Sequence, residues 1–89
     1  MDVPERREEP QSQDEIADEN RRIRRLQIMM SMVTSVICQD PSLTLEQASE
    51  LVANTKRAAL AMFPDKEFAY DILYKPRLQR LMRERFRLQ

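Results

Sequence analysis

LQIMMSMVTSVIC, residues 26–38, is the most apolar stretch of this chain and decides how it folds. Apolar residues recur every seven positions through this stretch and on toward the N-terminus, and two further apolar residues lie between these repeats. The residues of this seam are Ile16, Ile23, Leu26, Met30, Val33 and Ile37. A second apolar face consists of Ile28, Met29, Met32 and Val36. An ordinary surface helix carries one apolar stripe, so this helix is either packed on both faces by its neighbours or keeps a spare face for a partner.

The helix that contains this stretch is predicted to run from Gln13 to Gln39. Ser12 and Glu15 have the spacing of a capping box at its start. Pro41 ends it, because proline disfavours a helical conformation at the residue before it. At about 1.5 Å per residue the helix is about 40 Å long, so its polar first half is expected to project or to stay exposed.

A second capping box, Thr44 with Gln47, predicts a second helix that begins at Leu45 and ends near Met62, before Pro64. Its apolar positions recur at helical spacing. They are Leu45, Ala48, Val52, Ala59 and Met62, with Thr55 on the same face. No segment of the chain alternates apolar and polar residues as a strand would, so the sequence predicts an all-α fold.

A third helix is predicted to begin at Lys66, with Asp65 as its cap and with Phe68 and Ile72 facing the core. Further core positions are expected at Leu78, Leu81, Met82 and Phe86. Pro76 interrupts this run, and a kink is expected there rather than two separate helices. Because the loops between helices are short, sequential helices should be antiparallel. The predicted fold is one all-α domain over residues 12–89, a three-helix bundle with a long first helix and a third helix kinked at Pro76.

The composition argues against an enzyme. The chain has no Gly and no His, which removes phosphate-binding glycine loops, the commonest acid–base residue and most zinc sites. Cys38 is the only candidate nucleophile, and it lies near a helix C-terminus, where the dipole disfavours a thiolate. We therefore expect no catalytic, metal or cofactor site. One cysteine without an evident signal peptide suggests the cytoplasm, and an apolar run of about 13 residues is too short to cross a bilayer.

The charge is distributed unevenly along the chain. Residues 1–20 carry eight acidic and two basic side chains, whereas residues 21–89 carry thirteen basic and seven acidic ones. Residues 1–11 also contain two prolines and few apolar side chains, which predicts a disordered acidic tail. Arg77, Arg80 and Arg87 lie on one stripe of the last helix and are candidates for phosphate contacts on a nucleic acid. The alternative is an ordinary charged helix face that complements the helix dipole.

These observations favour a small, non-catalytic protein-interaction module: an adaptor, a regulator or a subunit. The expected contact residues are Ile28, Met29, Met32 and Val36, which would bind a protein partner or form a homodimer. The alternative function is that of a nucleic-acid-binding accessory protein that uses Arg77, Arg80 and Arg87. Tyr70 and Tyr74 are expected to cover the edge of the core with solvated hydroxyls, although such a pair can also form an aromatic binding ridge.

Overall fold

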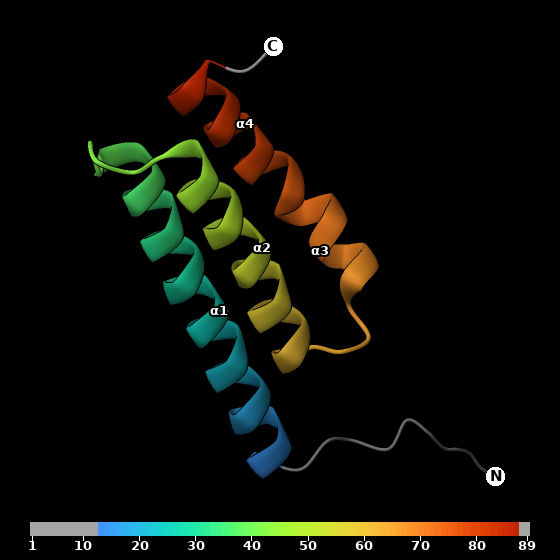
Figure 1. The fold of residues 1–89 in the computed structure, drawn as a ribbon. Coiled ribbons are helices and arrows are strands. Elements are labelled where there is room, and N and C mark those ends of the chain that lie inside the picture. Colours follow the sequence, from blue (N-terminus) through green and yellow to red (C-terminus); the bar gives the residue numbers. More distant parts are fainter. Residues whose placement is uncertain (1–12, 88–89) are drawn as a thin grey trace, which may run out of the picture.

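The computed structural model describes residues 13–87, and every regular element in this range is an α-helix (Figure 1). The helices are α1 (Gln13–Gln39), α2 (Leu45–Met62), α3 (Glu67–Leu73) and α4 (Lys75–Phe86). The predicted bounds of the first two helices are confirmed. The proposed cap at Ser12 and the tail of residues 1–11 lie outside the described residues.

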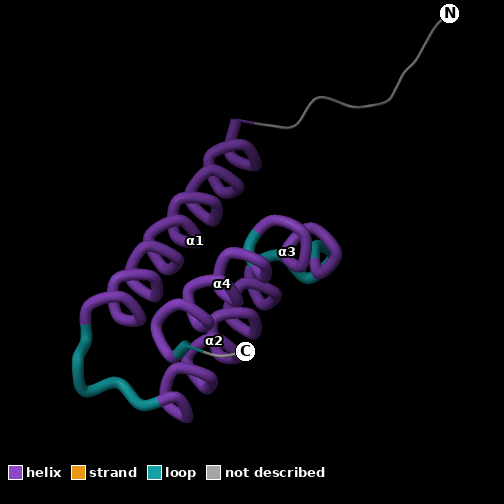
Figure 2. The backbone as a smooth tube through the Cα atoms, turned by 90° about the horizontal axis from the view of Figure 1, so that it is seen from above, coloured by secondary structure: helices purple, strands orange, loops and turns teal. Residues whose placement is uncertain are grey.

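The four helices follow an up-and-down course. α2 returns alongside α1, and α3 and α4 together run back in the direction of α1 (Figure 1). α4 contacts both α1 and α2, while α3 contacts α2 and α4. The view from above shows α4 beside α2, with α3 at the end of the molecule where α1 diverges (Figure 2). The backbones of α1 and α3 do not come into contact, which leaves a space between these two helices.

The core lies where α1, α2 and α4 meet. Ile37 and Leu78 are fully buried, and Met30 and Val33 complete the central cluster. Small side chains of α2 face the core at Ala48, Thr55 and Ala59, which lets α2 approach α1 closely. The seam of α1 is therefore buried only in its second half. Ile16 and Ile23 are 44% and 39% exposed, in agreement with the expectation that the first half of the helix stays in solvent.

The loop between α1 and α2 is held by local hydrogen bonds and by one arginine of α4. The predicted capping box is present: the Gln47 N–H donates to the Thr44 hydroxyl at 3.1 Å, and the Thr44 N–H donates to the Gln47 amide oxygen at 3.0 Å. Hydrogen bonds from the hydroxyl and the backbone N–H of Ser42 lower the pKa of Asp40. Arg85 donates to the Asp40 carbonyl at 2.8 Å and reaches the Leu43 carbonyl at 3.5 Å.

The third predicted helix is divided in the structure. Tyr74, with φ −112° and ψ −36°, separates α3 from α4, so the described residues contain four helices rather than three. Pro76 explains the break, because it has no N–H to donate to Ile72 and its ring crowds that carbonyl. The N-cap prediction was wrong: α3 begins at Glu67, Lys66 occupies the N-cap position, and no side chain caps the helix.

The predicted core face of α3 was also wrong. Phe68 and Ile72 are 79% and 56% exposed, whereas Tyr70 is only 5% exposed. Positions 68 and 70 are about 200° apart around a helix, so burying one turns the other toward solvent. Tyr70, Tyr74 and Leu78 follow one another at intervals of four, and it is this stripe that faces α1 and α2. Leu45, on the predicted apolar face of the second helix, is 38% exposed at the start of α2.

Candidate functional site

An open apolar groove runs between α1 and α2. It has a volume of about 490 Å³. Its α1 side contains all four residues that the sequence singled out for partner contact, and its α2 side adds further residues. The lining residues are Arg25, Ile28, Met29, Met32, Val33 and Val36 from α1 and Leu51, Asn54, Thr55 and Ala58 from α2.

The apolar side chains of this groove are largely accessible. Ile28 and Met32 are 55% and 63% exposed, Val36 is 37% exposed, and Met29 is half-buried. Thr55 is the buried polar residue of the groove, and its hydroxyl donates to the Leu51 carbonyl at 2.7 Å. The Thr55 hydroxyl therefore donates its hydrogen bond within α2 and needs no partner from outside. The surface that the groove presents to a binding partner is almost entirely apolar.

The sequence did not reveal the α2 side of this groove. The feature of the sequence that could have indicated it is the number of small residues in α2. Alanine and threonine beside the larger side chains of α1 leave a hollow between the two helices. Which face of α2 opposes Met29 and Met32 depends on how α1, α2 and α4 pack together, and a helical stripe alone does not specify it.

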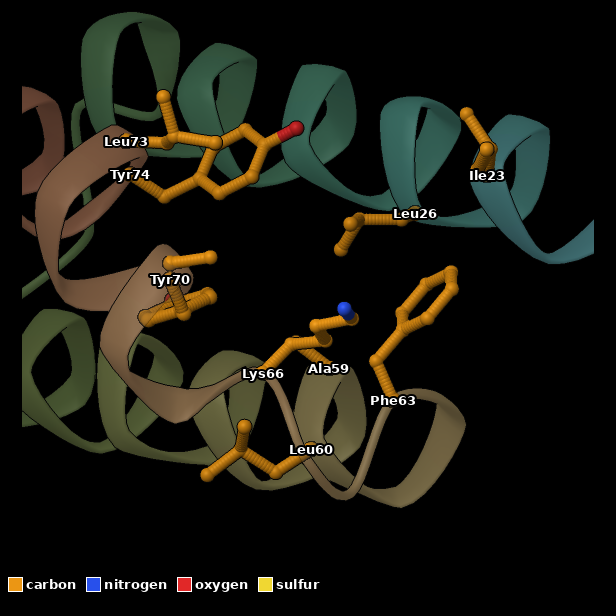
Figure 3. A pocket seen from close by; sticks show the side chains of 10 residues that line it. Ile23, Leu26, Ala59, Leu60, Phe63, Lys66, Tyr70, Leu73 and Tyr74 are labelled. Carbon is orange, nitrogen blue, oxygen red and sulfur yellow. The ribbon is translucent and has the colours of Figure 1, made fainter. Parts of the chain in front are cut away.

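A second, smaller hollow lies where α1 diverges from α3 (Figure 3). Its volume is about 200 Å³. α1, α2, the segment between α2 and α3, and α3 itself all contribute to its lining. The lining residues are Ile23, Leu26, Ala59, Leu60, Phe63, Lys66, Ala69, Tyr70, Leu73 and Tyr74. Lys66 is the only charged residue among them.

Tyr70 of α3 and Tyr74, which follows α3, form part of the wall of this second hollow. The ring centroids of Tyr70 and Tyr74 are 5.6 Å apart with an angle of 39° between the planes. The expectation of solvated hydroxyls was wrong for Tyr70, because its hydroxyl is buried and has no hydrogen-bond partner within residues 13–87. Burial raises the pKa of Tyr70, since the charged phenolate is disfavoured there.

Tyr70→Phe is expected to raise the free energy of unfolding by about 1 kcal/mol, because it removes a buried hydroxyl that makes no hydrogen bond. The raised pKa also means that the unfolded chain loses this proton before the folded one. Wild-type stability should therefore fall as the pH rises above about 10, and the variant should lose less. Urea unfolding at neutral and alkaline pH measures both effects. Tyr74→Phe is the control, and a loss of stability in Tyr70→Phe would contradict the prediction.

A lysine bridge joins α2 to α3 on the other side of Tyr70. The Lys56 ammonium lies 3.0 Å from a carboxylate oxygen of Glu67 and 3.1 Å from one of Asp71. Hydrogen bonds to Glu67 and then to Asp71 raise the pKa of Lys56. The two carboxylates are thus engaged in an ion pair that positions α3 on α2.

The arginines of α4 have different environments. Arg77, Arg80 and Arg87, the candidates for nucleic-acid contact, are all exposed. The guanidinium of Arg77 lies 5.8 Å from the centroid of the Tyr74 ring, and Arg87 ends α4 in a left-handed conformation with φ 56°. Arg85 differs from these three, because it is partly buried and binds the loop between α1 and α2.

The remaining candidates for chemistry are isolated. Cys38 is exposed at the end of α1. Within residues 13–87 no group of three or more Cys, Asp or Glu side chains is arranged to hold a metal ion. No helix of this described range has the length and apolar composition that crossing a membrane requires. Comparison with known protein families, with curated proteins and with solved structures finds no match to the chain.

Proposed function

We propose that this protein is a small, non-catalytic interaction module whose docking surface is the groove between α1 and α2. One observation carries the proposal: Ile28, Met32 and Val36 are exposed side by side and continue into Leu51 and Ala58 as one apolar surface. Contiguous apolar surface of this kind on a small protein marks an interaction site. Methionine side chains adapt their shape readily, which suits such a surface.

A second copy of the chain is the occupant that the groove fits best. Closed two-fold dimers use the same patch on both subunits, so the patch must be complementary to itself. Ile28 and Val36 lie at equal distances along α1 on either side of Met32. An antiparallel pair of α1 helices centred on Met32 therefore places Ile28 of each copy against Val36 of the other, and the two Met32 side chains meet at the axis.

The charges at the two ends of the groove support this orientation. Arg25 closes one end of the groove. At the other end, α2 begins beside the C-terminus of α1 and carries Glu46 and Glu50, both exposed. In the antiparallel pair, Arg25 of one copy approaches the end of the other copy that carries these carboxylates. Opposite charges near the two ends of the paired helices would favour this arrangement over the parallel one. The alternative function, nucleic-acid binding by Arg77, Arg80 and Arg87, is supported by exposed charge alone.

Light scattering coupled to size exclusion, over a range of concentrations, tests the proposal. We expect a mass approaching twice 10.6 kDa as the concentration rises. Met32→Asp should raise the dissociation constant at least tenfold, because two like charges would be buried at the axis. Ile72→Asp is the matched control: it adds the same charge at an exposed apolar position outside the groove. A monomer at every concentration, or equal weakening by both variants, would refute the homodimer.

A further inference from the structure

Apart from Lys66, the residues that line the hollow between α1 and α3 are aliphatic or aromatic. Leu26 of α1 points into it, with Leu73 and Tyr74 on one side and Phe63, at the end of α2, on the other (Figure 3). Ile23 of α1 also lines it. It exists because α3 packs on α2 and α4 and leaves the first half of α1 without a helix on this side. An apolar hollow of this kind favours an apolar ligand, since water inside it finds few hydrogen-bond partners.

Lys66, an exposed residue, brings a positive charge to the edge of this apolar surface. Figure 3 shows its side chain extended into the hollow, with the amino group between Leu26 and Phe63. The residue occupies the N-cap position of α3 without capping the helix. No ion pair or hydrogen bond joins its ammonium to another residue of the described chain, and the neighbouring Glu67 is engaged with Lys56. The ammonium is therefore available to a ligand.

A second cation stands at the rim of the hollow. The guanidinium of Arg22 lies 5.7 Å from the centroid of the Phe63 ring, so α1 brings a second positive charge to the Phe63 end of the hollow. None of the residues that line the hollow is acidic. An apolar interior with cations at its edge is complementary to a molecule with an apolar body and one negative charge.

We infer that this hollow binds a small organic anion whose apolar body, a single aromatic ring or a short alkyl chain, fills the space between α1 and α3 while its carboxylate pairs with Lys66. The size agrees with this class of ligand. A cavity on the order of 150 Å³ lined by Leu, Ile and Phe accommodates benzene. The hollow, of about 200 Å³, leaves room for a ring and a short tether to the charged group.

Three probes of nearly the same shape separate the contributions of charge and apolar contact: 3-phenylpropionate, 3-phenylpropan-1-ol and 3-phenylpropylamine. Each is titrated into the ¹⁵N-labelled full chain while amide chemical shifts are followed. We expect the shifts to concentrate at Leu26, Phe63 and Leu73. The acid should bind about fivefold more tightly than the alcohol, as expected for one partly exposed ion pair, and the amine should bind most weakly.

Two variants assign the effect to this site. Lys66→Gln should remove the preference for the acid and leave the affinity for the alcohol unchanged, whereas Lys75→Gln, the same change at an exposed position on α4, should preserve the preference. Ala69→Leu, which fills the hollow, should abolish binding of both probes. Equal affinities for acid and alcohol in the wild type, an equal effect of both lysine variants, or no shifts at millimolar probe would each overturn the inference.

Discussion

Val33→Asp is expected to leave a chain that has no cooperative unfolding transition. Val33 is 5% exposed and lies in the central cluster with Ile37 and Leu78. An unpaired carboxylate at this position must be buried without a partner or must force the core open, at a cost of several kcal/mol. A domain of this size has a total stability of only about 4–13 kcal/mol, so the variant should lose most or all of its folded population.

Thermal unfolding followed by circular dichroism at 222 nm measures this loss. Ser35→Asp is the matched control, because it adds the same side chain two residues away on the exposed side of α1. The control should unfold at nearly the wild-type temperature. A Val33→Asp protein with full helicity and a sharp transition would show that this side of α1 is open to water.

Leu78→Ala is expected to reduce the free energy of unfolding by about 2–5 kcal/mol. Leu78 is 1% exposed and is the side chain through which α4 enters the cluster formed by Met30, Val33 and Ile37. Its truncation removes apolar contacts and leaves a cavity between α4 and α1. Urea unfolding of the variant gives the value directly.

The matched comparison for Leu78→Ala is Leu73→Ala. Leu73 is 58% exposed at the end of α3, so its truncation removes little buried surface, and its effect should stay below about 1 kcal/mol. If both variants lose stability equally, α4 does not dock on α1 through Leu78, and the core is incorrectly located.

The sequence predicted the first two helices because their ends carry strong local signals. The capping box of Thr44 and Gln47 and the prolines at positions 41 and 64 act on neighbouring backbone atoms, so their effect does not depend on the tertiary structure. The apolar seam found in the sequence contains Met30, Val33 and Ile37, which the structure buries, although the sequence alone did not decide which face of the first helix is covered. The exposure of Ile16 and Ile23 on the same seam reflects the absence of a facing helix, which only the whole fold determines.

The register of α3 shows where local reasoning fails. Phe68 with Ile72 and Tyr70 with Tyr74 are both pairs at helical spacing, and hydrophobicity alone favours the first pair. The break at Tyr74 and the burial of Leu78 select the second pair. The same distinction applies to the candidate surfaces. The sequence identified the α1 side of the groove, which consists of Ile28, Met29, Met32 and Val36. The α2 side of the groove and the orientation of Lys66 depend on contacts between distant segments, so the sequence did not identify them.

The contact of Arg85 with the carbonyls of Asp40 and Leu43 bears on how the chain acquires its structure during synthesis. The chain emerges from the ribosome N-terminus first, so α1 and α2 can pair before α4 exists. At that stage Ile37 lacks the cover that Leu78 later gives, and the two carbonyls lack the donor that Arg85 supplies. A hairpin of α1 and α2 alone would therefore expose the apolar side that α4 covers in this structure. The arrangement of residues 13–87 is complete only when α4 has docked, because Leu78 and Arg85 both belong to this helix.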